Sequence, residues 1–126
     1  MTPAAAIAQS GIAAATLKLN ASASNIANAN DTSALGTPGY QPLGVANSAL
    51  PNGGVQAQAV TLKPGSTVIY DPTSPAANAV GLANAPEIDP INEMSNMLVA
   101  GKAFAFSVKV LQVADDEDKT LLDMTT

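Results

Sequence analysis

The positions of glycine and proline divide this chain into three parts. Of its 9 glycines and 9 prolines, 14 lie between Asp31 and Ile88, which leaves two long terminal stretches nearly free of both residues. Glycine and proline interrupt regular structure, so the terminal stretches are predicted to be helices and the middle is predicted to be rich in turns. The 126 residues allow one small domain.

The first stretch has the signals of a helix that begins at Pro3 and ends near Asn30. Thr2 can cap its N-terminus, and a proline at the first helical position loses no hydrogen bond. Asn28 is predicted to help end the helix, because asparagine tolerates the left-handed conformation of a helix cap. Bulky aliphatic residues recur every seven positions and predict an apolar seam: Ile12, Leu19 and Ile26.

The last stretch is predicted to form a second long helix, from Pro90 to about Met124, with Asp89 as its N-cap. Residues spaced three or four apart trace a stripe along it: Ile91, Met94, Leu98, Gly101, Ala105 and Val108. Further apolar residues widen or extend this stripe: Phe104, Leu111, Leu121 and Leu122. The stripe is predicted to pack against the first helix, in a pair that neighbouring molecules can share.

The fold class predicted is mainly α, with long N- and C-terminal helices packed as a coiled-coil-like pair and a small β-hairpin and loop-rich middle segment. One domain is expected overall. Residues 1–30 and 90–126 would form its discontinuous helical part, and residues 31–89 would form a turn-rich insertion of β-structure and loops.

The middle segment contains the pattern of a β-hairpin. Residues 55–62 alternate apolar and polar side chains, and residues 66–70 are a short β-branched run. Pro64 and Gly65 between them suit the two central positions of a type II turn, which predicts a positive φ at Gly65. The run Asn52-Gly53-Gly54 marks a turn before the first strand.

Composition excludes several kinds of site. The net charge of −5, with 5 lysines, no arginine and 10 carboxylates, argues against nucleic-acid binding. Without His or Cys the chain lacks Ser-His-Asp and Cys-His catalysis and both imidazole and thiolate metal ligands. The acidic run 115–118 lacks the glycine and alternating spacing of a calcium loop. We therefore predict no catalytic residue, no cofactor, no metal site and no enzymatic activity.

The apolar residues predict contact with other protein chains. Charged residues make up 12% of the chain and hydrophobic ones 47%, which is a poor surface for a monomer. No window is expected to reach the roughly 18 apolar residues of a membrane span. Residues 1–10 lack the basic start of a cleaved signal peptide. We expect neither direct membrane insertion nor signal cleavage.

Three motifs resemble those of flagellar basal-body rod and hook proteins. The first helix has a Gly11-Ile12 start and ends in Asn25-Ile26-Ala27-Asn28. Tyr70-Asp71-Pro72 is similar to the stretch before the last helix in proximal rod members of that family. The last helix shares the family's spacing at Glu93, Met94, Met97, Ala100, Lys102, Phe104, Val110 and Leu111. The chain departs from the family where Arg, Tyr and Asn are usual, at Lys102, Phe104 and Ser107, and also at Phe106, where a small residue is usual, and in its acidic run 115–118.

The resemblance implies a structural subunit of the flagellar rod that transmits torque from motor to hook. Its partners would be copies of itself, other rod proteins, and the flagellar type III export apparatus, which would deliver it to the periplasm without signal cleavage. The residues implied in subunit packing are Gly11, Ile12, Leu19, Asn25, Ile26, Ala27, Asn28, Glu93, Met94, Met97, Leu98, Phe104, Val108 and Leu111. The alternative is a soluble helical adaptor with no flagellar role, whose gene would lie apart from rod, hook and export genes.

Overall fold

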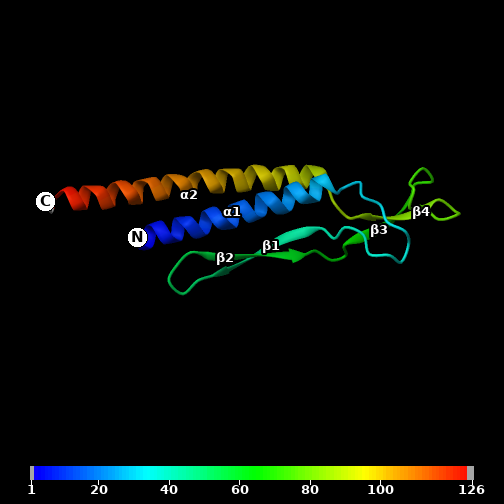
Figure 1. Cartoon of the computed structure of the whole chain (residues 1–126), viewed down its shortest axis with the longest axis horizontal. Helices are drawn as coiled ribbons and strands as arrows, with labels where there is room; N and C mark the ends of the chain where they lie inside the picture. Colours follow the sequence, from blue (N-terminus) through cyan, green and yellow to red (C-terminus); the bar gives the residue numbers. More distant parts are fainter. Residues whose placement is uncertain (1, 125–126) are drawn as a thin grey trace.

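A computed structural model describes residues 2–124, which form two terminal helices and a β-rich middle (Figure 1). The elements in chain order are α1 (Pro3–Ala27), β1 (Leu43–Ala49), β2 (Val55–Thr61), β3 (Ser66–Tyr70), β4 (Leu82–Pro86) and α2 (Pro90–Met124). The predicted division into helical ends and a turn-rich middle is confirmed.

Both helices begin where the sequence predicts. Thr2 Oγ1 accepts a hydrogen bond from the Ala5 backbone N–H at 3.3 Å, and Asp89 Oδ1 accepts one from the Ile91 N–H at 2.9 Å. These bonds satisfy donors that a helix N-terminus leaves open.

The end of α1 differs from the prediction in detail. The helix stops at Ala27, and its C-cap Asn28 has φ −106°. The expected left-handed cap is therefore wrong. The side-chain amide of Asn28 instead donates to the Ser24 carbonyl oxygen at 2.8 Å, which satisfies an acceptor in the last turn.

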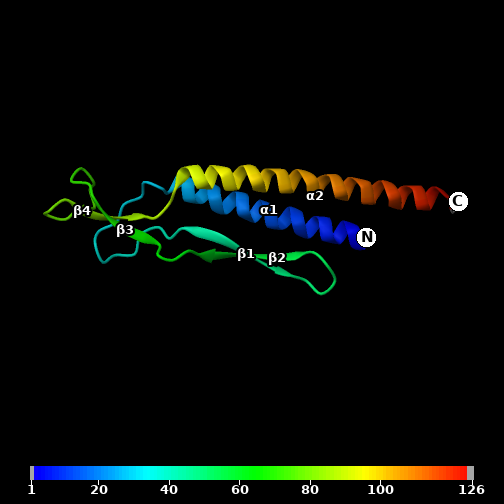
Figure 2. The ribbon, with the colours of Figure 1, turned by 180° about the vertical axis from the view of Figure 1, so that it is seen from behind.

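The molecule is layered, with α1 in the middle. One side of α1 packs along α2, which runs antiparallel to it, and another side packs on β1 and β2 (Figures 1 and 2). The pair β3–β4 lies beyond the end of the helices where α1 finishes and α2 starts. Because α2 has 35 residues and α1 has 25, the C-terminal part of α2 continues past the start of α1.

The strands pair differently from the predicted hairpin. β2 pairs antiparallel with β1, from Leu43↔Thr61 to Ala49↔Val55. β3 pairs antiparallel with β4. The predicted pairing of residues 55–62 with 66–70 is therefore wrong, although both segments are strands. β1 and β4 lie outside the two strands that the sequence predicts.

The turn chemistry explains this change of partner. Gly53 and Gly54 have φ of 82° and 87°, and they close the β1–β2 hairpin at the turn that their sequence marks. Gly65 does not have a positive φ, so the predicted type II turn is wrong. A Cβ at Gly65 would overlap the Gln41 side chain, so the absence of a side chain at Gly65 leaves room for a neighbouring loop.

The loop after α1 is joined to the last strand before α2. Ser33 and Asn84 form an isolated antiparallel bridge, in which each backbone N–H donates to the other residue's carbonyl oxygen at 2.9 Å. This bridge ties together the two segments that leave and enter the helix pair.

The interior is built from small side chains. Among residues 2–124, the buried hydrophobic residues are all alanines: Ala5, Ala8, Ala14, Ala15, Ala21, Ala83, Ala100 and Ala114. The largest fully buried side chains are Asn25 and Pro42. A buried alanine removes much less apolar surface from water than a buried leucine, so this core contributes little hydrophobic stabilisation.

Candidate subunit-packing site

Asn25 holds three elements together from a fully buried position at the end of α1. Its amide nitrogen donates to the Leu43 carbonyl oxygen at 2.8 Å and to Glu93 Oε1 at 3.0 Å. Its oxygen accepts from the Leu43 N–H at 2.8 Å and from the Tyr40 hydroxyl at 2.9 Å. The Asn25 clamp, meaning Asn25 with these three partners, therefore fixes α1 against the start of β1 and the first turn of α2.

The clamp brings together two residues that the family motif singled out. Asn25 and Glu93 are 68 positions apart, and their side chains are hydrogen-bonded. Tyr40 and Leu43 complete the clamp but were not predicted. Leu43 takes part through its backbone, which leaves no trace in residue type. Tyr40 is one of two tyrosines in the chain, and the rarity of this residue was the available signal.

A second anchor fixes the tip of the β1–β2 hairpin near the N-terminal half of α1. Ser10 Oγ accepts a hydrogen bond from the Val55 N–H at 3.1 Å. A Cβ at Gly53 would lie 2.9 Å from the end of the Ile7 side chain. The hairpin is thus attached to α1 at both ends.

The two helices approach closely at Gly11. A Cβ added at Gly11 would lie 2.7 Å from Ser107 Oγ of α2. The absence of a side chain at Gly11 therefore lets α1 and α2 pack closely at this point.

The row of α2 residues that faces α1 is not the predicted one. Buried or half-buried residues on this row recur at intervals of three, seven, four and three: Met97, Ala100, Ser107, Leu111 and Ala114. Of these, Ala100 and Ala114 are fully buried. The predicted stripe includes Ile91, Met94 and Leu98, which are 75%, 60% and 70% exposed. Its assignment to the seam with α1 is wrong, because the small residues of the adjacent row fit closer to α1.

Two apolar rows of α2 therefore remain on the surface. Stripe A is the predicted row without its last member, the half-buried Val108, and consists of Ile91, Met94, Leu98, Gly101 and Ala105. Stripe B consists of Val99, Phe106, Val110, Val113 and Leu121, all exposed. Since successive helical residues are about 100° apart, the row facing α1, stripe A and stripe B lie roughly 120° from one another around the axis of α2.

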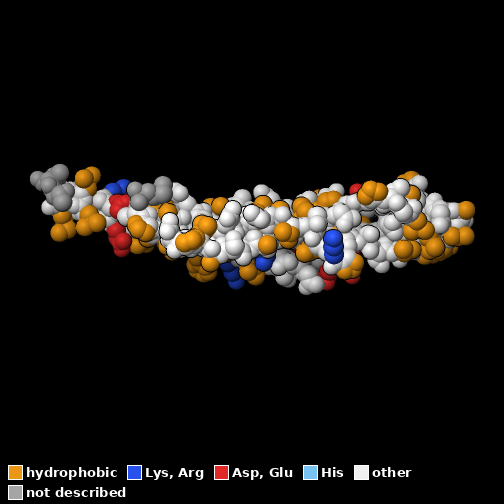
Figure 3. Space-filling view, turned by 90° about the horizontal axis from the view of Figure 1, so that it is seen from below, with side chains coloured by type: hydrophobic (Ala, Val, Ile, Leu, Met, Phe, Trp, Pro, Cys, Tyr) orange, Lys and Arg blue, Asp and Glu red, His pale blue; other side chains and the backbone are white. Residues whose placement is uncertain are grey.

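Each stripe borders a hollow with a charged rim. The hollow along stripe A lies between the helices and is lined by Leu19, Met94, Met97, Leu98, Gly101, Lys102 and Ala105. The hollow on stripe B is lined by Val113, Asp116, Glu117, Thr120 and Leu121. The first hollow is therefore lined by a lysine and the second by two carboxylates, and a third hollow, beside Val110 and Val113 of stripe B, is lined by both Lys109 and Glu117. On the face drawn in Figure 3, charged side chains are few and far apart.

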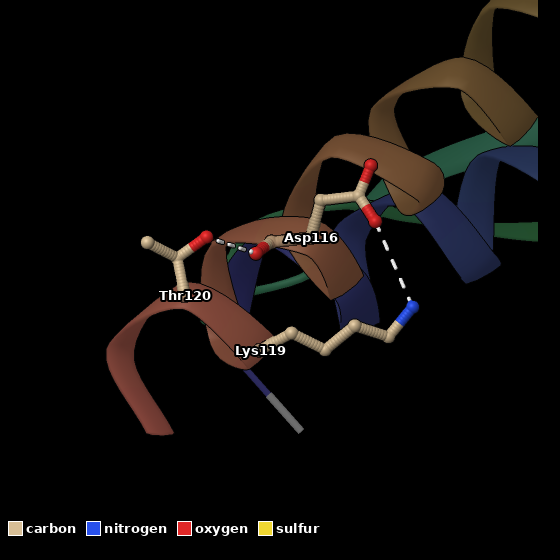
Figure 4. A network of polar contacts seen from close by, with 3 residues as sticks. All are labelled: Asp116, Lys119 and Thr120. Atoms are coloured by element: carbon tan, nitrogen blue, oxygen red, sulfur yellow. Dashed lines mark hydrogen bonds and ion pairs between the residues drawn. The ribbon is translucent and has the colours of Figure 1, made fainter. Parts of the chain in front are cut away.

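The acidic end of α2 is loosely organised (Figure 4). Lys119 Nζ lies 3.7 Å from Asp116 Oδ1, and the two side chains are 75% and 78% exposed. Thr120 Oγ1 donates to the Asp116 carbonyl oxygen at 2.9 Å. An exposed ion pair of this kind contributes about 0.2–1 kcal/mol, so it can exchange partners readily.

The predicted packing residues fall into three groups. Those at contacts within the molecule are Gly11, Asn25 and Glu93. Half-buried residues are Ile12, Leu19, Ile26, Asn28, Met97, Val108 and Leu111. Exposed residues are Ala27, Met94, Leu98 and Phe104. The structure joins Asn25 to Glu93, places Gly11 separately against Ser107, and leaves the third group exposed.

One helix is long and apolar enough to cross a membrane. Within α2, an 18-residue window has a mean hydropathy of 1.5, and 11% of that window is buried. The expectation that no window of the sequence approaches a membrane span is therefore wrong, because this window has the length and the hydropathy of one. The low burial shows that the apolar surface of α2 is left uncovered by the rest of the chain.

Fold and surface together define a long helical hairpin with a β-rich middle that leaves apolar faces of α2 exposed. The family described as flagellar basal body rod FlgEFG protein C-terminal matches residues 81–124, which contain β4 and α2. Among similar proteins is the flagellar basal-body rod protein FlgC of Salmonella typhimurium, 31% identical over 83% of this chain and 83% of its own length.

Two further relatives bear the same name. The FlgC of Aquifex aeolicus is 30% identical over 87% of this chain and 86% of its own length. The FlgC of Buchnera aphidicola is 33% identical over 86% and 85%. The chain belongs to the flagellar basal-body rod protein family and has the role of a structural rod subunit. These relatives give no support to the soluble adaptor.

Proposed function

We propose that the chain assembles helically with copies of itself and with other rod proteins, in a rod that transmits torque from motor to hook. The observation that carries this proposal is the pair of uncovered apolar stripes on α2, next to the row already covered by α1. A helix that is apolar on all sides is buried within a larger body. Neighbouring subunits would cover the two stripes of α2, and the apolar side chains buried in this way would add to the small core of each subunit.

Residues 1–30 and 90–126 would form the helical body of the subunit, and residues 31–89 the insertion. The covered α2 residues Ala100, Ser107 and Ala114 recur every seven positions, which supports a coiled-coil-like pairing with α1. The β1–β2 hairpin lies on the side of α1 away from α2. With α2 turned toward the neighbouring helices, this hairpin would lie toward the outside of the assembly.

The predicted packing residues would then have two roles. Exposed Met94, Leu98 and Phe104 would contact neighbouring subunits. Gly11, Asn25 and Glu93 would position the two helices that present them, because their contacts lie within the molecule. The remaining packing residues are half-buried, apart from exposed Ala27, and would enlarge the contact with neighbouring subunits.

We further propose that the subunit passes unfolded through the flagellar type III export apparatus to the periplasm without signal cleavage. The alanine-rich interior supports this route, since burial of little apolar surface gives a low free energy of unfolding. Packing against neighbours after export would supply the missing stability.

Protein neighbours explain the apolar window of α2 better than a membrane does. Lys102 and Lys109 lie within the apolar part of this helix. A lysine at the centre of a membrane-spanning helix costs roughly 2.5–3.5 kcal/mol. We therefore propose no direct membrane insertion. The acidic balance and the lack of His and Cys support a subunit that neither binds nucleic acid nor acts as an enzyme.

The test is to isolate basal bodies from cells that carry an epitope-tagged copy of the chain in place of the native gene. The tagged chain should co-purify with the rod, and deletion of the gene should abolish rod assembly and motility. Leu98→Asp should exclude the chain from basal bodies, whereas Asn52→Asp in the hairpin turn should leave incorporation unchanged. A chain that is absent from purified basal bodies would refute the proposal.

A further inference from the structure

Building on the rod function above, we propose that stripe A of one copy packs against stripe B of a second copy. The two α2 helices would run parallel with a stagger of about 15 residues, or ~22 Å along the helix axis. The occupant of the hollow beside Leu98 would then be the C-terminal part of α2 from a neighbouring copy.

The first support is that one helix carries two different apolar faces. Stripe A includes a hollow near its start with Leu19 of α1 on the far wall, whereas the hollows of stripe B lie further along α2, one of them beside Ala4 of α1. Packing like on like would join two copies and leave the other stripe uncovered. Packing A on B covers both stripes and repeats from copy to copy, as a heterologous contact does in an open helical assembly.

The second support is the charge on each rim. Lys102 lines the hollow of stripe A, and Asp116 and Glu117 line the hollow of stripe B. A contact between two A faces would bring lysines together, and a contact between two B faces would bring carboxylates together. At these two hollows the mixed contact opposes Lys102 to carboxylates, and juxtaposed like charges disfavour the other pairings.

The third support is a common register. A parallel stagger of 15 residues places Ile91 against Phe106, Leu98 against Val113, and Lys102 against Glu117 of the neighbour. One displacement therefore satisfies two apolar pairs and one ion pair. Parallel orientation follows from the rod, because copies related by rotation and translation about one axis point the same way along it.

Cysteine cross-linking in basal bodies tests the register, since the chain has no cysteine of its own. Cells would express two differently tagged copies, one with Leu98→Cys and one with Val113→Cys. After mild oxidation, the disulfide between the two tags should be at least about tenfold more abundant than either same-tag disulfide. Leu98→Cys paired with Gln56→Cys on β2 serves as the matched control and should give no cross-link.

Three outcomes separate the inference from the function on which it rests. A dominant mixed cross-link supports the A-on-B contact. Same-tag cross-links, or none, in basal bodies that contain the chain would overturn the contact and leave the rod function intact. Absence of the chain from basal bodies would overturn the rod function and this contact with it.

Charge reversal supplies an independent readout of the same contact. Lys102→Glu or Glu117→Lys alone should lower the yield of the mixed cross-link about tenfold, because like charges then meet. Both changes in one chain should restore the yield to within about threefold. Lys63→Glu, on the exposed loop between β2 and β3, changes the net charge equally and should have no effect. Failure of the double variant to recover would overturn the Lys102–Glu117 pairing.

Discussion

The two helices use their apolar residues in opposite ways. α1 buries seven of its 25 residues, and six of the seven are alanine or serine. α2 is longer and carries most of the bulky apolar side chains, yet it buries two alanines among its 35 residues. The molecule therefore packs internally through small side chains and leaves the large ones outside.

This difference shows where the stability of the folded chain comes from. Burial of a methylene group contributes about 0.8 kcal/mol and burial of a leucine side chain about 1.5–3 kcal/mol, so the alanine interface between α1 and α2 is weak. Within the molecule, directed hydrogen bonds such as those of the Asn25 clamp therefore contribute a larger share of the stability of the fold. Between molecules, the exposed stripes of α2 hold most of the unused apolar surface.

The largest expected effect comes from breaking the clamp. Asn25→Leu should destabilise the chain by about 3 kcal/mol, because it leaves the Leu43 backbone groups and Glu93 without their buried partner. Denaturant unfolding followed by circular dichroism measures the change. Asn28→Ala removes one half-buried hydrogen bond and should cost less than half as much. Equal losses in the two variants would contradict the central role given to Asn25.

The next effect separates the two neighbouring rows of α2. Ala100→Leu should destabilise the isolated chain by about 1–3 kcal/mol, since it overpacks a buried position against α1. Leu98→Ala should change the stability of the isolated chain by less than about 0.5 kcal/mol, because Leu98 is exposed. Thermal unfolding of the two variants is the measurement. A larger loss of stability for Leu98→Ala than for Ala100→Leu would show that stripe A packs against α1 after all.

A smaller effect compares the two helical glycines. A Cβ at Gly101 meets nothing within 4 Å, so Gly101→Ala should stabilise the chain by about 0.8–1 kcal/mol through helix propensity. Gly11→Ala should gain little, since its Cβ must displace Ser107 Oγ. In a Ser107→Ala background, Gly11→Ala should recover most of the gain. A double-mutant cycle of unfolding free energies tests this coupling.

The smallest effect lies in the loop between β3 and β4. Hydrogen bonds from the Thr73 hydroxyl and then the Thr73 backbone N–H lower the pKa of Asp71 below its ordinary value of 3.8. A lowered pKa means that the carboxylate stabilises the folded loop above pH 3.8, and that this contribution is lost as the pH falls through the lowered value. Thr73→Val should raise the pKa of Asp71, which a carboxyl NMR titration measures. An unchanged pKa would show that the Thr73 hydroxyl is not its cause.

The sequence by itself determined the local features of this protein. Thr2 with Pro3 and Asp89 with Pro90 start the helices where their chemistry predicts, because capping depends on a few adjacent residues. Gly53 and Gly54 form a turn for the same reason. The motifs around Asn25 and Glu93 were sufficient to indicate the rod family. The hydrogen bond between these two side chains could not be derived from spacing, since it joins positions 68 residues apart.

Tertiary structure decided which partner each face and each strand takes. Three rows of α2 repeat at helical intervals: the row facing α1, stripe A and stripe B. Periodicity alone does not show which of the three packs against α1. The row with Ala100 and Ser107 faces α1 because small side chains let the two backbones come close at Gly11. Similarly, β2 meets β1 rather than β3 because the Gly53-Gly54 turn reverses the chain and the segment around Gly65 does not. Steric fit between distant segments made both choices.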